Sequence, residues 1–474
     1  MVRLLGFGLL GIWLLCACAP RLALKPSLPP IPGHFVQAPE KTLPEIPDPW
    51  WRSLGSPELE RLISETLKNN HELQKAAARV TELAARARES RAERSPQLSA
   101  ELSGERALQN FGGRLGGLPG GFIYGQWQGT LRASYEVDLF RRLSAAERAA
   151  RLETLAAEED RWALALALVA ETATAYTQAV FAECELQVLK EEVSLSQKRL
   201  DLLKARFREG LLSAPEWLSE KRKHLLLSAQ VSLLRQELTE AKQRLEILTG
   251  RYPGGRLFLS EASRGLCRLR LSPPPAGLPA ELLRRRPDVR AAEARLRAAA
   301  ERVKAARAAR FPHLVLTAEE GRVSNALKDL LAHRHRFWTL LFSTTQTVFD
   351  AGKLSSEEAA ARAALLEARE DYAQTVLTAF SEVERALSSE RRLRENLRRK
   401  EGALEEARRR VGFLAEREKV GLLPAPEYLA ARLALCEAQR EVLRQRRTLL
   451  ENRIFLYRAL AGGFGKLSLE ESRP

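Results

Sequence analysis

Aromatic side chains and methionine are scarce in this chain of 474 residues: aromatics make up 6%, and the single Met is the initiator. Ala, Leu, Arg and Glu dominate instead, a balance that favours long helices over a large aromatic-rich globular core. A lone Met also excludes a relay of thioether ligands for copper(I) along the chain. The composition therefore predicts a protein built mainly from long helices.

Long apolar runs are also absent after residue 18, so we expect no transmembrane helix in the mature chain, and any membrane insertion must use strands. The N terminus carries only a short run, residues 4–15 after Arg3, which is typical of a signal-peptide core. Leu15-Cys16-Ala17-Cys18 resembles a bacterial lipobox. We predict a signal peptide at residues 1–17 and lipidation of Cys18; cleavage of an ordinary signal peptide near residues 17–19 is the alternative.

Paired cysteine spacing and catalytic motifs are missing as well. Cys184, Cys267 and Cys436 show no spacing of a metal site or a disulfide framework, and we predict that they are buried thiols. The chain has no nucleophile elbow, no phosphate-binding loop and no carboxylate pair singled out from its many Glu residues. His333 and His335 are interpreted as part of a solvated basic loop. We therefore expect no enzyme activity, no cofactor and no metal site.

The formal charge of +16 is compatible with nucleic acid binding, but the basic residues alternate with Glu along helical stretches and form no basic tail. Export also argues against a nucleic acid partner. We interpret most of these charges as solvated helix faces.

The chain contains an internal repeat. GLLSAPEWL from Gly210 recurs as GLLPAPEYL from Gly421, and the same offset of 211 places VDLFRR from Val137 over VFDAGK from Val348. Residues 141–209 contain no Gly or Pro and keep helical periodicity, which predicts one helix about 100 Å long; residues 353–420 are the counterpart, with Gly402 and Gly412 inside. Helices of this length need partner helices along their flanks.

Four other stretches alternate apolar and polar side chains with the period of a β-strand, in place of helical periodicity. Residues 125–140 place apolar side chains on one parity and polar ones on the other, and residues 97–109, 313–324 and 337–350 do so less cleanly. Each stretch is about long enough to cross a bilayer as a tilted strand. Four strands cannot close a barrel in lipid, so the chain must oligomerise: a dimer supplies eight strands and a trimer twelve, and only the wider ring leaves a lumen. A soluble two-hairpin sheet packed on helices is the alternative.

The strands are predicted to meet the long helices at DLFRR and FDAGK. Asp138 and Asp350 are expected to be local helix caps. In the second half, Gly352 gives the backbone the conformational freedom to bend at this junction. In the first half, Arg141 stands at the equivalent position, and the backbone must bend without a glycine.

The segment AGLPAELLRRRPDVRAAEARLRAA from Ala276, together with the repeated turn at Gly210 and Gly421, resembles the TolC-like outer membrane factors, especially the lipoprotein branch that serves resistance-nodulation-division (RND) efflux pumps. The resemblance covers almost the whole chain. It implies a mainly α fold with a transmembrane β-barrel, in which a homotrimer forms a 12-stranded barrel and a 12-helix periplasmic α-barrel. It also implies an outer-membrane location, a passive conduit for efflux, and partners in a periplasmic adaptor and an inner-membrane RND transporter.

The same resemblance places functional residues at the periplasmic tips, where the adaptor docks: Gly210, Leu211, Val420, Gly421 and Leu422. A Gly-Leu-Leu turn that only ends a helix is the alternative. Members of the family often carry Asp rings at the gate, but this chain has no Asp between residues 373 and 474. We hypothesise that Glu-Arg or Glu-Lys pairs between neighbouring chains replace those rings, and solvated charges are the alternative. The candidate gate residues are Glu416, Arg417, Glu418, Lys419 and Glu427.

The expected organisation is a signal peptide (1–17), a lipid-anchored segment (18–56), a first repeat (57–249), a linker (250–278), a second repeat (279–463) and a C-terminal tail (464–474). Two other functions are compatible with parts of this pattern. One is the outer-membrane channel of a type I protein secretion system, and the other is a structural periplasmic coiled coil without a pore.

Overall fold

The computed structural model describes residues 30, 32, 35–37, 49–109, 122–269 and 279–462. The predicted signal peptide and Cys18 lie outside these residues. Within them, the chain divides into two compact units. We call Arg79–Ala157 with Ala292–Ala373 the strand unit, and Leu28–Ala78 with Glu158–Ala291 and Gln374–Pro474 the hairpin unit.

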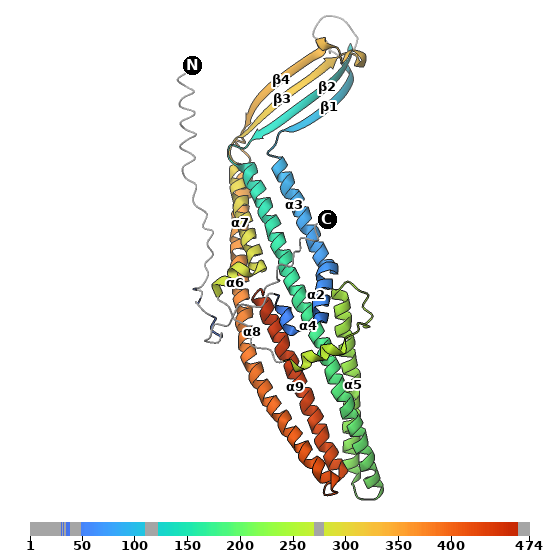
Figure 1. Cartoon of the computed structure of the whole chain (residues 1–474). Helices are drawn as coiled ribbons and strands as arrows, with labels where there is room; N and C mark the ends of the chain where they lie inside the picture. Colours follow the sequence, from blue (N-terminus) through green and yellow to red (C-terminus); the bar gives the residue numbers. More distant parts are fainter. Residues whose placement is uncertain are drawn as a thin grey trace. The chain divides into compact units, whose positions relative to one another are not determined.

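Helices and strands follow one another in the duplicated order that the sequence predicts (Figure 1). Their bounds are η1 Trp50–Leu54, α2 Pro57–Asn69, α3 His71–Ala92, β1 Gln97–Gln109, β2 Phe122–Val137, α4 Arg142–Arg208, α5 Ala214–Leu248, η2 Glu261–Arg268, α6 Pro279–Arg285, α7 Pro287–Ala308, β3 His313–Ser324, η3 Leu327–Asp329, η4 His333–His335, β4 Arg336–Thr345, α8 Lys353–Lys419 and α9 Ala425–Ala459.

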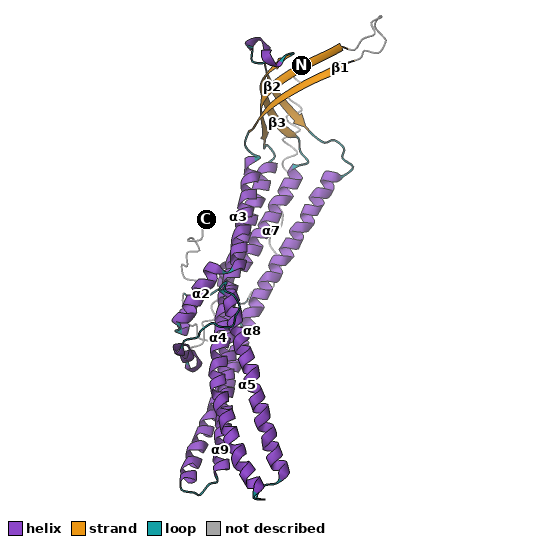
Figure 2. Cartoon of the chain, turned by 90° about the vertical axis from the view of Figure 1, so that its right-hand side faces the viewer, coloured by secondary structure: helices purple, strands orange, loops and turns teal. Residues whose placement is uncertain are grey.

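The strand unit contains one four-stranded antiparallel sheet in the order β1-β2-β3-β4, which confirms the four predicted strands (Figure 2). The register places Ala133 opposite Leu98 on one side and Ala318 on the other, so that the apolar parities of the strands share one face of the sheet. Near the β3–β4 connection, Glu320, Arg322 and Arg336 fall on the same parity. This face is strongly exposed, with Leu98, Leu102, Trp338, Leu340 and Phe342 each more than 60% accessible. The opposite face is polar and carries an ion pair between Arg132 and Glu319. The sheet is therefore apolar on one side and wettable on the other, and β1 and β4 are its two open edges.

Two strands differ in extent from the prediction. β4 ends at Thr345, not near residue 350, because Thr345 pairs with His313, the first residue of β3 after Pro312, and no ladder remains beyond it. β2 spans Phe122–Val137, where residues 125–140 were expected, because Asp138 leaves the ladder to cap the next helix.

Aspartates connect each second strand of a hairpin to a long helix, as predicted. Asp138 accepts hydrogen bonds from the Leu143 and Ser144 amides, and Asp350 accepts one from Leu354 at 2.8 Å. Burial opposes ionisation of Asp138, but the bonds from Ser144 and Leu143 outweigh it and lower the pKa of that carboxyl. The chain turns through a positive φ at both junctions, 87° at Gly352 and 62° at Arg141, so the first junction bends without glycine.

Within the strand unit, the repeat preserves one buried carboxylate in each half. Glu147 on α4 pairs with Arg94 and with Arg151, four residues further along its own helix. Glu358 on α8, 211 residues later, pairs with Arg310 at 2.8 Å and with Arg362 at 2.6 Å. Each carboxylate thus joins a long helix to the end of the shorter helix that precedes the first strand.

The two longest helices, α4 and α8, each contain 67 residues, which confirms the prediction, and Gly402 and Gly412 do not interrupt α8. The helical segment before β1 is divided at Asn70 into α2 and α3. Asn70 Oδ1 accepts hydrogen bonds from the Glu72 and Leu73 amides, and its Nδ2 donates to the Leu248 carbonyl at 3.1 Å. A side chain that caps the second helix therefore ends the first.

The core of the hairpin unit lies where α2, α4, α5 and α9 meet. Trp50 is fully buried and stacks on Tyr457 at 5.1 Å. In the described part of the chain, α4 contains one 18-residue window apolar enough to cross a membrane by composition, and 72% of that window is buried inside the protein. Its hydropathy is therefore that of a helix segment packed mostly inside the protein.

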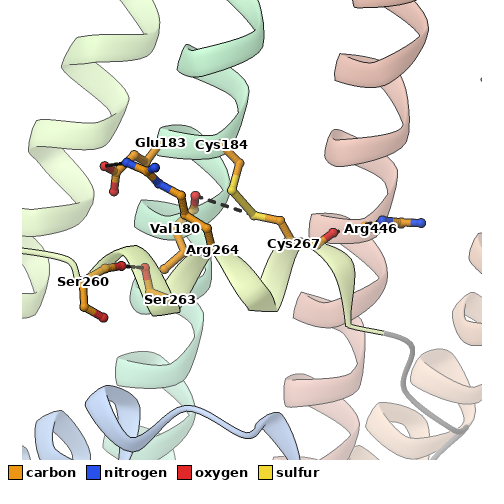
Figure 3. Close-up of a disulfide and its surroundings, with 8 residues drawn as sticks. All are labelled: Val180, Glu183, Cys184, Ser260, Ser263, Arg264, Cys267 and Arg446. Atoms are coloured by element: carbon orange, nitrogen blue, oxygen red, sulfur yellow. Dashed lines mark hydrogen bonds and ion pairs between the residues drawn. A yellow bond between two sulfur atoms is a disulfide. The ribbon is translucent and has the colours of Figure 1, made fainter.

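The prediction of unpaired cysteines is wrong for two of the three. Cys184 on α4 and Cys267 on η2 form a disulfide across 83 residues of sequence (Figure 3). Cys436 is a buried free thiol. The two half-cystines belong to elements whose packing the sequence spacing does not reveal. Burial raises the pKa of Cys436 to about 11.

Candidate functional site: the helix-hairpin tips

Both helix hairpins of the hairpin unit end in the same glycine-centred turn. Gly210 follows α4 with φ 72°, and Gly421 follows α8 with φ 73°. The amide of the residue after each glycine donates a hydrogen bond to a carbonyl in the last helix turn. Leu211 donates to Arg206 and Leu422 donates to Arg417, both at 2.9 Å. This is the Schellman arrangement, which uses a left-handed residue to satisfy the last helix carbonyls. The glycines are therefore required by the backbone of each turn.

The residues beside these glycines are exposed and apolar. Leu211, Val420 and Leu422 are 69%, 67% and 68% accessible. The two turns lie at the same end of the hairpin unit (Figure 1). Nothing in the described part of this chain covers the aliphatic side chains that they present. Such a surface is suited to a partner that buries it, because each aliphatic side chain fully buried gains about 1.5–3 kcal/mol.

Arg199, which the sequence analysis did not single out, holds the two hairpins together near their tips. Its guanidinium pairs with Glu220 on α5, and its Nε donates to the Pro426 carbonyl of α9 at 3.2 Å. A signal for the first contact exists in the sequence. In an antiparallel helix hairpin, residues nearly equidistant from the turn face each other; Arg199 and Glu220 flank Gly210 in this way, as Lys400 and Glu441, 2.8 Å apart, flank Gly421.

The candidate gate residues lie around the end of α8. Lys419 Nζ contacts Glu416 at 2.8 Å within the same helix, and this bond raises the pKa of Lys419. Arg417 lies over the Phe413 ring at 5.8 Å, while Glu427 belongs to the first turn of α9. Glu418 is half-buried and supplies the carbonyl to which the Gly421 amide donates. The structure thus gives Lys419 a carboxylate partner inside one chain.

Further from the tips, a buried ion network joins the two halves of the repeat. Arg440 on α9 is 6% accessible; it donates to Glu192 on α4 at 2.8 Å and to Gln230 on α5 at 2.7 Å. Glu185, also buried, accepts from Arg440 at 3.4 Å and from Arg444 at 2.8 Å. Burial raises the pKa of Glu192 despite the opposing effect of Arg440. No sequence motif indicated this cluster, because its members come from three helices.

The RRPD segment, on which the family resemblance rests, has a structural role. Arg286 binds both oxygens of Asp288, at 3.0 and 2.6 Å, and reaches Glu382 at 2.7 Å and the Ala459 carbonyl at 3.0 Å. One buried guanidinium therefore connects the start of α7 to α8 and to the end of α9.

No group of three or more His, Cys, Asp or Glu side chains that could hold a metal ion occurs in the described residues. His333 and His335 lie in η4 on the β3–β4 connection, where Arg334 donates to His335 at 3.2 Å.

Comparison with known proteins agrees with these features. The family model described as outer membrane efflux protein matches residues 62–251 and 278–462. The chain is 32% identical over 424 residues to the pyoverdine export outer membrane protein OpmQ of Pseudomonas aeruginosa, covering 88% of this chain and 87% of OpmQ. It is 29% identical over 417 residues to the toluene efflux pump outer membrane protein TtgC of Pseudomonas putida, covering 88% and 85%.

Solved structures show the same fold. The crystal structure of CusC, described as a transmembrane channel, has a TM-score of 0.78 at 27% identity and covers 94% of this chain and 100% of CusC. The CmeC outer membrane channel of Campylobacter jejuni has a TM-score of 0.83 at 22% identity and covers 96% of each chain. With two family-model segments that cover most of its length, the chain belongs to the outer membrane efflux protein family and is an efflux channel protein of the outer membrane.

Proposed function

We propose that the chain acts as a homotrimer, the exit duct of a tripartite efflux pump, and conducts substrates passively from a periplasmic adaptor and an inner-membrane RND-type transporter to the exterior. The observation that carries this proposal is the open four-stranded sheet with one strongly exposed apolar face. In lipid, the unpaired backbone groups of β1 and β4 must find partners, and only a closed barrel supplies them. Three copies place twelve strands in one ring, wide enough for a lumen.

The docking of the adaptor is assigned to the two glycine-centred turns, through Gly210, Leu211, Val420, Gly421 and Leu422. Their support is the pair of matching backbone turns and the accessible aliphatic side chains beside them. The names of relatives such as OpmQ and TtgC, an export protein and a pump component, favour efflux over type I secretion. The duct itself conducts passively, so the inner-membrane partner supplies the energy for transport.

The lipid anchor is proposed at Cys18 on the sequence pattern alone. A Cys18→Ala variant is expected to lose the acyl groups, which mass spectrometry of the N-terminal peptide detects.

The assembly is tested by mass and conductance. Detergent-extracted protein is expected to have about three times the mass of one chain and to conduct in planar bilayers, with long closed periods.

If Glu416 and Glu418 restrain the tips through pairs with neighbouring chains, a Glu416→Ala/Glu418→Ala variant should raise the mean conductance. An unchanged conductance in that variant contradicts the proposed gate alone, whereas a monomer that never conducts contradicts the duct.

The docking surface is tested by placing charge on it. A Leu211→Asp/Leu422→Asp variant is expected to lose about 2 kcal/mol or more of binding energy, roughly a 30-fold weaker adaptor complex, because a carboxylate cannot be buried without a partner. The measurement is adaptor binding to the purified channel, together with efflux-dependent resistance of cells.

The matched control is Leu211→Met/Leu422→Met, which keeps the apolar surface and should bind normally. Equal binding by the Asp and Met variants, at equal outer-membrane levels, would show that the turns are not the docking surface.

A further inference from the structure

A short segment between the two repeats crosses the hairpin unit and is fastened to it at three points. We call residues 251–269 the strap. Its start is held by Glu246 at the end of α5, which accepts the amides of Gly255, Arg256 and Leu257 at 2.6, 2.8 and 2.9 Å. Its middle is held by Glu58 of α2, which accepts from Ser260 Oγ at 3.1 Å. The first two fastenings are therefore hydrogen bonds to carboxylates.

The third fastening is covalent. The Cys184–Cys267 disulfide joins η2, the last element of the strap, to α4 (Figure 3). The contacts beside it are weaker: an Arg264–Glu183 ion pair at 3.3 Å and a bond of 3.0 Å from Arg446 to the Cys267 carbonyl. The disulfide thus fixes η2 to α4 covalently, beside these polar contacts.

Both half-cystines are closed off from solvent once the strap lies in place. Cys184 is 8% and Cys267 4% accessible, and Leu257, Leu259 and Leu266 of the strap are buried in the same core. A protein-sized oxidant needs direct access to a sulfur to exchange with it. The bond therefore cannot form through such an exchange after docking.

We propose that Cys184 and Cys267 are an oxidative maturation site: a thiol-disulfide exchange protein of the periplasm joins them while the strap is undocked, and docking then seals the bond. An outer-membrane protein crosses this oxidising compartment on its way to assembly, which makes the reaction available.

The exchange balances without another reactant. A thiolate of one cysteine attacks the disulfide of the donor protein, forming a mixed disulfide and releasing one donor thiolate. The second cysteine thiolate then attacks the mixed disulfide, forms the Cys184–Cys267 bond and releases the other donor sulfur. In total, the chain gives up two protons and two electrons, and the donor leaves as a dithiol.

The remaining thiol does not compete for this pairing in the folded unit. Cys436 is 2% accessible, and burial raises the pKa of its thiol to about 11, which leaves almost no thiolate at neutral pH. Cys436 is therefore a matched control: a cysteine of the same unit that is buried but not bonded.

The first test maps the bond in protein extracted from outer membranes. Non-reducing digestion is expected to yield a cross-linked peptide pair containing Cys184 and Cys267, with Cys436 alkylated only after unfolding. In a host that lacks its periplasmic disulfide-donor protein, the cross-linked pair should fall at least about fivefold. An unchanged yield in that host contradicts the exchange protein, and absence of the pair in the normal host contradicts the site.

The second test measures access and attachment. Reduction of the native protein by a soluble dithiol is expected to be at least about tenfold slower than in urea, because the strap must first lift. Cys267→Ser should expose Arg264 and Arg268 in the strap, so that trypsin cleaves there at least about tenfold faster, whereas Cys436→Ser should leave cleavage unchanged. If Cys267→Ser does not fold, wild-type protein reduced in urea and then refolded without oxidant provides the comparison. Equal reduction rates in the two states overturn the sealing of the bond by docking. Equal cleavage of the reduced and the oxidised strap overturns the role of the disulfide in holding the strap.

Discussion

Replacement of Arg440 by Met is expected to lower the free energy of unfolding by about 3–5 kcal/mol, because it leaves the buried Glu192 carboxylate without its guanidinium partner. Glu192 loses its 2.8 Å partner, while Glu185 keeps Arg444. A urea titration of the purified channel measures the loss. Arg432→Met on the same helix is the matched control: Arg432 pairs with Glu191 at 2.6 Å but in an exposed position, so about 0–1 kcal/mol is expected there.

The pH dependence distinguishes this explanation from lost packing. Burial raises the pKa of Glu192 above its usual value of 4.5, so its contribution to stability is full below that value and declines as the pH rises through the folded pKa. Without Arg440 the folded pKa is higher still. The deficit of Arg440→Met should therefore be small below pH 4.5 and largest near neutrality.

A second variant separates the charge from the cavity. Arg440→Met/Glu192→Gln removes the uncompensated carboxylate and should recover much of the loss at neutral pH. A deficit that is independent of pH and is not recovered would assign the effect of Arg440 to packing alone.

A charge at Leu102 is expected to prevent assembly of the barrel. Leu102 lies near the middle of β1 on the apolar face and is 66% accessible in one chain. An arginine on the lipid face near the bilayer midplane costs about 2–4 kcal/mol, and the proposed trimer would incur this cost three times. Leu102→Arg should therefore reduce the heat-resistant oligomer in outer membranes severely, as seen on unheated gels.

The adjacent residue provides the control, because successive side chains of a strand point to opposite faces. Ser103 pairs with Gln128 on the polar face, and Ser103→Arg should assemble normally. If both arginine variants assembled equally well, the apolar face would not be the lipid-facing one.

Local patterns predicted the fold where each element depends on its own residues. The absence of Gly and Pro over residues 141–209 predicts α4, and the alternation around Tyr135 predicts β2. Asp138 and Asp350 were identified as caps because a cap acts within a few residues. The end of β4 depends on where its partner β3 begins, and the sequence of residues 337–350 alone does not carry that information.

The candidate site was predictable to a smaller extent. The repeated GLL segments indicate two turns, because a glycine in the left-handed region is a local requirement. The Cys184–Cys267 bond and the Arg440 network join helices far apart in sequence, and helical periodicity says nothing about which faces meet. Such contacts depend on tertiary packing.

The two open edges of the sheet, β1 and β4, have a consequence for the meaning of stability in this protein. If their backbone groups are satisfied only by other copies, folding of the strand unit and association are one reaction, governed by mass action. The melting temperature should then rise with the concentration of protein in the detergent micelle, and dilution alone should favour dissociation. A barrel closed within one chain has no such dependence, so a stability value for this channel has meaning only at a stated protomer concentration.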